Sequence, residues 1–122
     1  MLNKIFIMGR LTADVELRRT TTGKPVASFK LAVKRDGKED ATDFIDVVAW
    51  NGTAEFASRY FSKGRMMIVE GRLQIREWQD KQGNKRKSAE VIAEEIYFGD
   101  SKKEDKGKSF AEIPDDDGDL PF

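Results

Sequence analysis

Apolar and polar residues alternate through most of residues 3–98, with the period of two that is typical of β-strands. Runs of apolar and β-branched residues bounded by turn signals predict strands over residues 3–10, 15–20, 26–34, 44–50, 65–78 and 86–98. The clearest run is residues 26–34, where Ala27, Phe29, Leu31 and Val33 share one face and Ser28 and Lys30 share the other. Turn signals separate the runs at Thr22–Pro25, Asp36–Gly37 and Gly83–Asn84.

One segment has the spacing of a short helix instead. Asn51 or Thr53 can cap a helix over residues 54–63, and Gly64 can end it. The face that this helix should bury carries Ala54, Ala57, Tyr60 and Phe61. Because the chain has one helix and no alternation of strands with helices, the pattern predicts an all-β fold: a small, closed or partly open antiparallel barrel.

The run at residues 3–10 departs from the alternation, because both of its faces are apolar. Ile5 and Ile7 lie on one face, and Phe6 and Met8 lie on the other. A strand with one face in water should carry polar residues there, so we expect something to cover the second face. Another subunit is the expected cover, since a body of about 96 residues buries only a modest core of its own.

The strand at residues 44–50 has one small, aliphatic face and one unusual face. Ile45, Val47 and Ala49 are suited to a barrel core. The opposite face pairs two large rings with an acid, which is unusual for a core, and consists of Phe44, Asp46, Val48 and Trp50.

The long run at residues 65–78 divides in the same way. Its aliphatic face is predicted to join the core and consists of Met67, Val69, Gly71, Leu73 and Ile75. The opposite face carries Arg72, Gln74, Arg76 and Trp78. Guanidinium groups can neutralise phosphates and an indole can stack on a base, so this stripe is suited to single-stranded nucleic acid. The alternative is an amphipathic lid, in which the arginine stems pack on the tryptophan at the edge of the core.

Two basic loops would extend this surface if they flank it. Lys34, Arg35 and Lys38 belong to the first hairpin, and Lys85, Arg86 and Lys87 follow the later turn. Solvated lysines are the ordinary occupants of loops, so these residues indicate a nucleic-acid site only together with the rings.

Charge is unevenly distributed along the chain, although 22 basic and 22 acidic residues cancel overall. Residues 99–122 hold eight of the acids and four lysines, which leaves residues 1–98 with 18 basic and 14 acidic groups. A basic body joined to an acidic tail indicates a nucleic-acid ligand, although a solvated body with a solubility tail has the same balance.

Missing residue types narrow the possible chemistry. The chain has no cysteine and no histidine, which excludes thiolate and imidazole catalysis, disulfides and zinc sites built from those ligands. We therefore expect no enzyme activity and no cofactor. A carboxylate-metal nuclease built on Asp43, Asp46 or Glu70 is the remaining catalytic alternative, and no metal-ligand spacing supports it.

The first apolar run is too short for a membrane span and lacks a cleavage signal, so a cytoplasmic protein is expected.

The last residues combine an acidic run with large apolar side chains. Residues 99–112 have too little apolar content to fold and are expected to form a flexible linker with a span of about 20 Å. Residues 113–122 then offer a partner both negative charge and large apolar side chains that a pocket can bury. The partner-binding residues predicted from this composition are Asp115, Asp116, Asp117, Asp119, Leu120, Pro121 and Phe122. A solubility tail would have no use for Leu120 and Phe122.

Nearly the whole chain resembles the bacterial single-stranded DNA-binding protein (SSB) family. The resemblance rests on "NKIFIMGRL", "PVASFKLAV", "DFIDVVAWNGTAEFASRYFSKGRMMIVEGRLQIREW" and "DDDGDLPF". It implies an OB-fold, a five-stranded, partly open Greek-key barrel, over residues 1–98. It also implies a homotetramer built as a dimer of dimers, sequence-tolerant binding of single-stranded DNA, association with the nucleoid, and docking of replication, recombination and repair enzymes on the tail.

The base-stacking rings of that family correspond to Phe44, Trp50 and Trp78 in this sequence. A further aromatic residue of the family lies in the hairpin at residues 34–43, which here is short and has none. This difference leaves the length of DNA wrapped per subunit open. An OB module that binds RNA or serves as a replication accessory is the nearest alternative, and the tail argues against it.

Overall fold

The computed structural model describes residues 1–37 and 41–100. The six strands and single helix in this part are β1 (Ile5–Leu11), β2 (Leu17–Arg19), β3 (Pro25–Lys34), β4 (Thr42–Trp50), α1 (Asn51–Tyr60), β5 (Met66–Gln79) and β6 (Lys85–Phe98). The all-β prediction is confirmed, and the predicted turns at Gly23 and Gly83 have the positive φ angles, 90° and 83°, that glycine tolerates best. In the described ranges, no helix has the length and apolar character that crossing a membrane requires.

The strands form one sheet in the order β1-β5-β6-β4-β3-β2, which closes on itself where β1 also pairs with β3. Most neighbours are antiparallel, whereas β4 and β6 run parallel at Val47↔Val91 and Val48↔Ile92. This closed sheet with one helix is the expected OB-fold. It has a sixth strand because residues 17–19 pair separately with β3.

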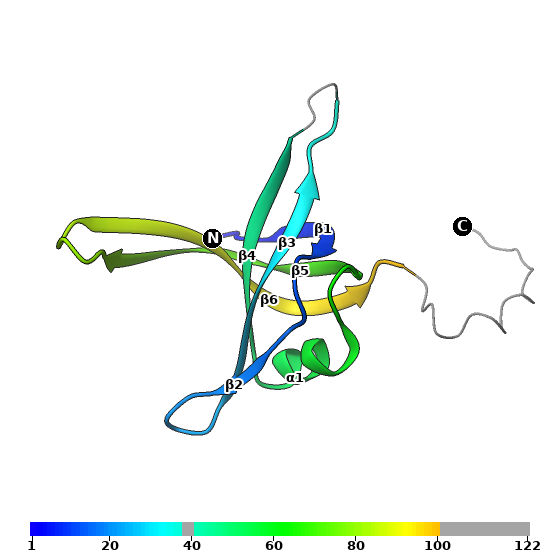
Figure 1. Cartoon of the computed structure of the whole chain (residues 1–122), viewed down its shortest axis with the longest axis horizontal. Helices are drawn as coiled ribbons and strands as arrows, with labels where there is room; N and C mark the ends of the chain where they lie inside the picture. Colours follow the sequence, from blue (N-terminus) through cyan, green and yellow to red (C-terminus); the bar gives the residue numbers. More distant parts are fainter. Residues whose placement is uncertain (38–40, 101–122) are drawn as a thin grey trace, which may run out of the picture.

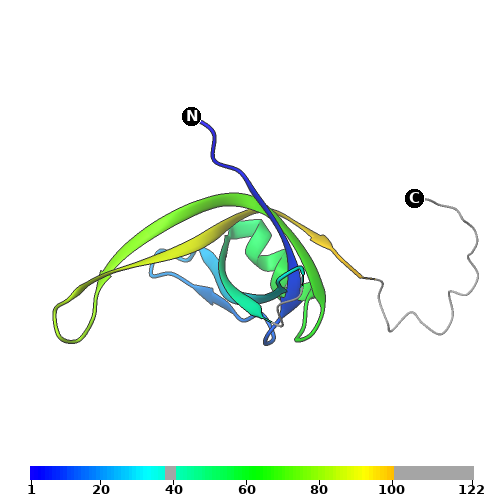
Figure 2. The ribbon, with the colours of Figure 1, turned by 90° about the horizontal axis from the view of Figure 1, so that it is seen from above.

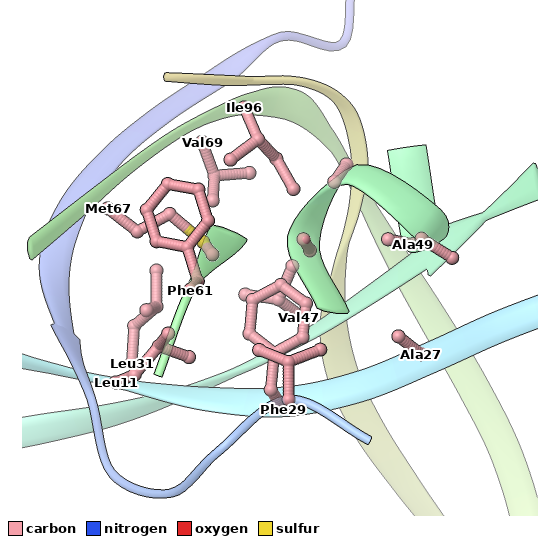
Figure 3. Packing of buried hydrophobic residues seen from close by; sticks show 14 of the residues in the cluster. Leu11, Ala27, Phe29, Leu31, Val47, Ala49, Phe61, Met67, Val69 and Ile96 are labelled. Atoms are coloured by element: carbon pink, nitrogen blue, oxygen red, sulfur yellow. The ribbon is translucent and has the colours of Figure 1, made fainter. Parts of the chain in front are cut away.

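Apolar side chains from facing strands fill the barrel, together with the rings of Phe29 and Phe61 (Figure 3). Val47 of β4 and Met67 and Val69 of β5 are almost fully buried there, as their places in the alternating pattern predict. Helix α1 covers one end of the barrel with Ala54 and Ala57, whose small side chains allow close approach (Figure 1).

The helix begins and ends three residues earlier than the sequence pattern predicts. It starts at Asn51, directly after the extended Trp50, and no side chain caps it. It ends at Tyr60, because Phe61 adopts extended backbone and inserts its ring into the core. Gly64 instead forms the turn into β5, where its φ is 88° and its N–H donates to the carbonyl of Leu11. Tyr60, predicted to be buried, is exposed.

The prediction that Leu73 and Ile75 belong to the core is wrong. Their side chains are 43% and 54% exposed, although they lie on the same side of β5 as the buried Val69. The reason is that β5 and β6 continue beyond the barrel as a long hairpin, here called the arm (Figures 1 and 2). Leu73 pairs with Val91 and Ile75 with Ala89 across this hairpin, and the Leu73 backbone also exchanges two hydrogen bonds with the Asn3 side chain.

Ordered contacts extend slightly past the expected boundary at residue 98. The N–H of Gly99 donates to the carbonyl of Met66, and the carboxylate of Asp100 accepts from the Met66 N–H and from Arg65. Arg65 also lies 5.5 Å from the centre of the Phe98 ring. These contacts hold the end of β6 against the start of β5 through residue 100.

Candidate nucleic-acid interface

Strand β4 places two large rings on the outside of the barrel. Phe44 is 60% exposed and Trp50 is 41% exposed, whereas Val47 between them points into the core. The sequence-based division of this strand into a core face and an outer face is therefore correct. Two ring faces are available to a flat ligand on this strand.

The arm carries the third ring and the arginines on the same outer side of the sheet. Trp78 is 40% exposed, and its indole N–H donates to the Ser88 hydroxyl at 2.8 Å, which ties the ring to β6. Arg72 and Arg76, which alternate with Gln74 along β5, are also exposed. We call the surface made by these residues and the two rings of β4 the ring face: Phe44, Trp50, Arg72, Arg76 and Trp78.

The two parts of the ring face form one continuous surface. Because β6 lies between β4 and β5 in the sheet, its outer residues join the two ring-bearing strands. A hollow of about 310 Å³ spans the junction, and side chains from four strands line it. They include Ser28 and Lys30 of β3, Asp46 and Val48 of β4, Arg76 of β5 and Glu90 of β6.

The tip of the arm presents the three predicted basic residues, Lys85, Arg86 and Lys87, at an ordered turn. Asp80 accepts from the backbone N–H groups of Gln82 and Asn84 and from the Arg86 side chain. The Asn84 N–H, followed by the Arg86 side chain, holds the pKa of the Asp80 carboxyl below its usual range despite some desolvation. Trp78 lines a hollow of about 560 Å³ at this tip together with Glu77, Gln79, Lys85, Arg86 and Lys87.

The hairpin between β3 and β4 brings further cations toward the Phe44 end. Lys34 is exposed, and Arg35 binds the Asp43 carboxylate with nitrogen–oxygen distances of 3.0–3.3 Å. The hydrogen bond from Arg35 lowers the pKa of Asp43. Lys38, the third predicted cation of this loop, lies outside the described residues.

Among the residues of this surface that were not singled out as site candidates in the sequence, Lys30, Ser88 and Asp80 make specific contacts or carry charge. Lys30 lies on the outer side of β3, Ser88 fixes the Trp78 indole, and Asp80 orders the arm tip. The alternation of residues 26–34 does place Lys30 on the outer face, so that signal was available. Ser88 and Asp80 act through contacts across the hairpin, which depend on its register.

The three carboxylates proposed for a nuclease are held separately. Asp43 pairs with Arg35, Asp46 pairs with Lys30 at 2.6 Å, and Glu70 pairs with Lys4 at 3.2 Å. Among residues 1–37 and 41–100, no three acidic side chains gather closely enough to hold a metal ion. The geometry therefore gives the nuclease alternative no support.

A second outer surface lies at the other end of the same strands. Phe6 and Met8 of β1 and Tyr97 of β6 are exposed there, and we call this surface the β1 face. Its polar groups are mutually paired: Lys4 contacts Glu70 and Glu94, and the Tyr97 hydroxyl donates to Glu70. The Glu94 and Glu70 hydrogen bonds raise the pKa of Lys4, and the Glu70 bond raises that of Tyr97.

The predicted partner-binding residues of the tail, from Asp115 to Phe122, lie outside the described residues. Their role therefore depends on the sequence alone.

Comparison with known proteins identifies the group to which this barrel belongs. A model of the Single-strand binding protein family matches residues 2–99, which is most of the chain. The chain belongs to the single-strand binding protein family. Proteins of this family bind DNA without catalysing a reaction, which agrees with the sequence-based expectation of no enzyme activity.

Curated relatives in this family resemble the chain over almost all of its length. Single-stranded DNA-binding protein 3 of Clostridium acetobutylicum is 39% identical, and the match covers 99% of this chain and 100% of that protein. The single-stranded DNA-binding protein of Caldanaerobacter subterraneus subsp. tengcongensis is 38% identical, with both chains fully covered. That of Thermotoga maritima is 40% identical over 94% of this chain and 88% of its own length.

Proposed function

We propose that this protein binds single-stranded DNA on the ring face, with little preference for base sequence. The observation that carries the proposal is the placement of three exposed rings, Phe44, Trp50 and Trp78, on one continuous surface that also carries exposed cations. Unpaired bases expose the flat faces that such rings can stack on, whereas the bases of a duplex are already stacked on each other. Membership of the single-strand binding protein family supports the same conclusion.

The cations of the ring face bind the phosphates that link the stacked bases. Arg72 and Arg76 lie on the same side of β5 as Trp78, so a strand stacked on the indole passes over them. Phosphates at the two ends of this path are bound by the basic loops, which contain Lys34, Arg35, Lys85, Arg86 and Lys87. Stacking and charge both tolerate any base, which accounts for the lack of sequence preference.

The β1 face joins copies of the chain, and the assembly is a homotetramer built as a dimer of dimers. Phe6 and Met8 expose a large apolar area, which a second copy of the same surface can cover. The paired charges of Lys4 and its two glutamates lie beside that area and satisfy one another. Self-association would bury both features and place several ring faces on one particle.

The tail recruits enzymes of replication, recombination and repair to the bound strand at the nucleoid, in the cytoplasm. Of the expected linker at residues 99–112, Gly99 and Asp100 are anchored to β5, and the remainder acts as the linker. Residues 113–122 act as the docking segment, in which Asp115, Asp116, Asp117 and Asp119 contact basic residues of the partner and Leu120, Pro121 and Phe122 fill an apolar pocket. Several tails on one assembly multiply a weak contact.

The acidic segment also competes with DNA. Without DNA, it occupies the basic ring face, so deleting residues 113–122 should tighten DNA binding at low salt. Equal affinity with and without the segment would remove this last point.

Titration with labelled oligonucleotides tests the central proposal. We expect tight binding of oligo(dT) and of mixed single strands, much weaker binding of a duplex of the same length, and affinity that falls with rising salt. Equal affinity for duplex and single strand would refute the proposal. Competition between DNA and RNA of one sequence tests the RNA-binding alternative, which predicts that RNA wins.

A further inference from the structure

The hollow at the centre of the ring face contains two acidic side chains as well as two basic ones. Across neighbouring strands β3, β4 and β6, the outer residues at this level are Lys30, Asp46 and Glu90. The register partner of Glu90 on β5 is Gln74, and Arg76, two residues further along β5, reaches Glu90 diagonally with its side chain. We call Lys30, Asp46, Glu90 and Arg76 the charge row. A surface selected only to attract phosphates would not carry two carboxylates at its middle, so their presence needs a physical explanation.

The two carboxylates are neighbours because of the parallel pairing of β4 and β6. Asp46 and Glu90 each precede the first paired residues of this register, Val47 and Val91, by one position. Both side chains line the same hollow. Two like charges so placed repel each other, unless cations compensate them from the outer sides.

Each carboxylate is compensated by the cation on its outer side. Lys30 Nζ lies 2.6 Å from Asp46 Oδ1, and its strand partner in the β3–β4 register is Asp46 itself. Arg76 Nε lies 3.2 Å from Glu90 Oε2 across the β5–β6 hairpin. The row is therefore neutral as a unit, although Asp46 lies between Phe44 and Trp50 along β4 and Arg76 lies near Trp78 on β5.

We propose that Asp46 and Glu90 are internal competitors of the DNA phosphates for Lys30 and Arg76. A phosphate that binds either cation must displace a carboxylate from it, and the displaced carboxylate then repels the strand. The pairs thus lower the affinity of the resting protein for DNA. They also reduce its dependence on salt, because a cation already neutralised by a carboxylate contributes less to the net release of ions on binding.

This role differs from that of a base contact or of a purely structural ion pair. Lys30, Arg76 and Asp46 are each about half exposed, so these pairs can exchange partners at small cost. Glu90 is the more enclosed partner, with a side chain 13% exposed. Asp46 is therefore the better position for a test. If the Glu90 variant does not fold, the Asp46 variant alone still tests the proposal.

The test compares Asp46→Asn, Glu90→Gln and the double variant with the wild type, using labelled oligo(dT) over a range of salt. Each single change should tighten binding at low salt by about twofold to fivefold, the range expected for an exposed ion pair. It should also steepen the slope of log affinity against log salt by up to about 0.7 for each cation released. The control is Glu55→Gln, which removes the same charge from the exposed pair between Arg19 of β2 and Glu55 of α1. Circular dichroism and thermal unfolding confirm that each variant is folded.

A double-mutant cycle shows whether Asp46 acts through Lys30. In a Lys30→Gln background, the change Asp46→Asn should no longer steepen the salt slope. The proposal is overturned if Asp46→Asn behaves like Glu55→Gln, if its effect on the slope persists without Lys30, or if it weakens binding of oligo(dC) while leaving oligo(dT) unchanged. The last result would make the carboxylate an acceptor for base amines.

This inference rests on the proposed function, and the two fail in different ways. If the wild type does not distinguish single strands from duplex, the proposed function fails. If the wild type binds single strands preferentially and the variants keep its affinity and salt slope, only the competition between carboxylates and phosphates is refuted.

Discussion

The ring face and the β1 face share the two long strands β5 and β6 but carry different chemistry. On the ring face, rings alternate with cations and a central row of ion pairs. On the β1 face, exposed Phe6 and Met8 lie beside Lys4, whose charge two glutamates compensate. Exposed aromatic residues alone therefore do not identify a nucleic-acid surface, and the charges around them indicate which partner each face suits.

An irregularity in the sheet separates the two faces. The register of β5 against β6 shifts between Glu70 and Gly71, where β6 carries one extra residue. Residues 66–70 of β5 lie at the β1 face, and past Gly71 the strand runs along the barrel beside the part of β6 that pairs with β4 and then into the arm (Figure 2). A bulge of this kind increases the local bend and twist, so the two ends of one strand pair can serve different partners.

The largest expected effect comes from filling the space at that irregularity. In Gly71→Ala, the new Cβ would lie 2.0 Å from the carbonyl oxygen of Ile92, so β5 and β6 would have to separate. We expect a loss of about 3 kcal/mol or more in the free energy of unfolding, at the upper end for overpacking. Urea denaturation measures it. Gly52→Ala is the control, because nothing lies within 4 Å of its added Cβ. Equal stability of the two variants would contradict the assignment of Gly71 as the junction.

Removing a ring from the ring face should cost most of its stacking energy. Trp78→Ala is expected to weaken binding of oligo(dT) and of mixed sequences by a similar factor, about 10-fold to 100-fold, since stacking contributes about 1–3 kcal/mol per base. Fluorescence anisotropy with a labelled strand measures the change. Tyr60→Ala is the matched control, because that ring is similarly exposed but lies on α1. If the Trp78 variant binds oligo(dT) as tightly as the wild type, the stacking role is wrong.

The same substitution at one exposed phenylalanine of each face, Phe6 or Phe44, should have different effects and so separates the roles of the two faces. Phe6→Ser should shift the protein toward smaller assemblies, because it removes apolar area worth about 2 kcal/mol per copy when buried. Phe44→Ser should leave the mass unchanged and weaken DNA binding by about tenfold. Light scattering and strand titration on both variants separate the effects. The assignment fails if Phe44→Ser alters the mass and Phe6→Ser does not.

The smallest effect concerns pH at the end of β6, next to the β1 face. Burial alone would raise the pKa of Asp100, but hydrogen bonds from Arg65 and the Met66 N–H outweigh it and lower the pKa. A carboxyl whose pKa is lower in the folded state stabilises the protein above its unfolded pKa of about 3.9, and this contribution disappears as the pH falls through the folded value. Asp100→Asn should therefore lower stability by about 1 kcal/mol at neutral pH and flatten the acid limb of a melting-temperature profile. An unchanged acid limb would show that this pair does not contribute.

Local pattern was sufficient for several features of the fold and the site. Alternation placed Val47 inside and Phe44 and Trp50 outside, because the period of a strand is two wherever one of its sides meets the core. The same pattern failed for Leu73 and Ile75. It reports which side of a strand a residue occupies, and it does not report how far the neighbouring strands extend.

The end of helix α1 is another feature that tertiary packing decides and local sequence does not. Residues 54–63 have a favourable local pattern, but the core space available to Phe61 decides where the helix ends. The basic loops were also recognisable as basic, whereas the turn geometry that Asp80 imposes on the arm tip depends on the register of the hairpin.

By itself, the sequence determined the strands, the core of the barrel and the outward placement of the rings and arginines, because these follow from the two-residue period and from turn chemistry. Tertiary structure alone decided that β5 and β6 leave the barrel as an arm and that four strands bring two ion pairs into one row. The physical reason is that both depend on pairing between residues far apart in the chain, including the parallel contact of β4 with β6, and no local pattern encodes such a register.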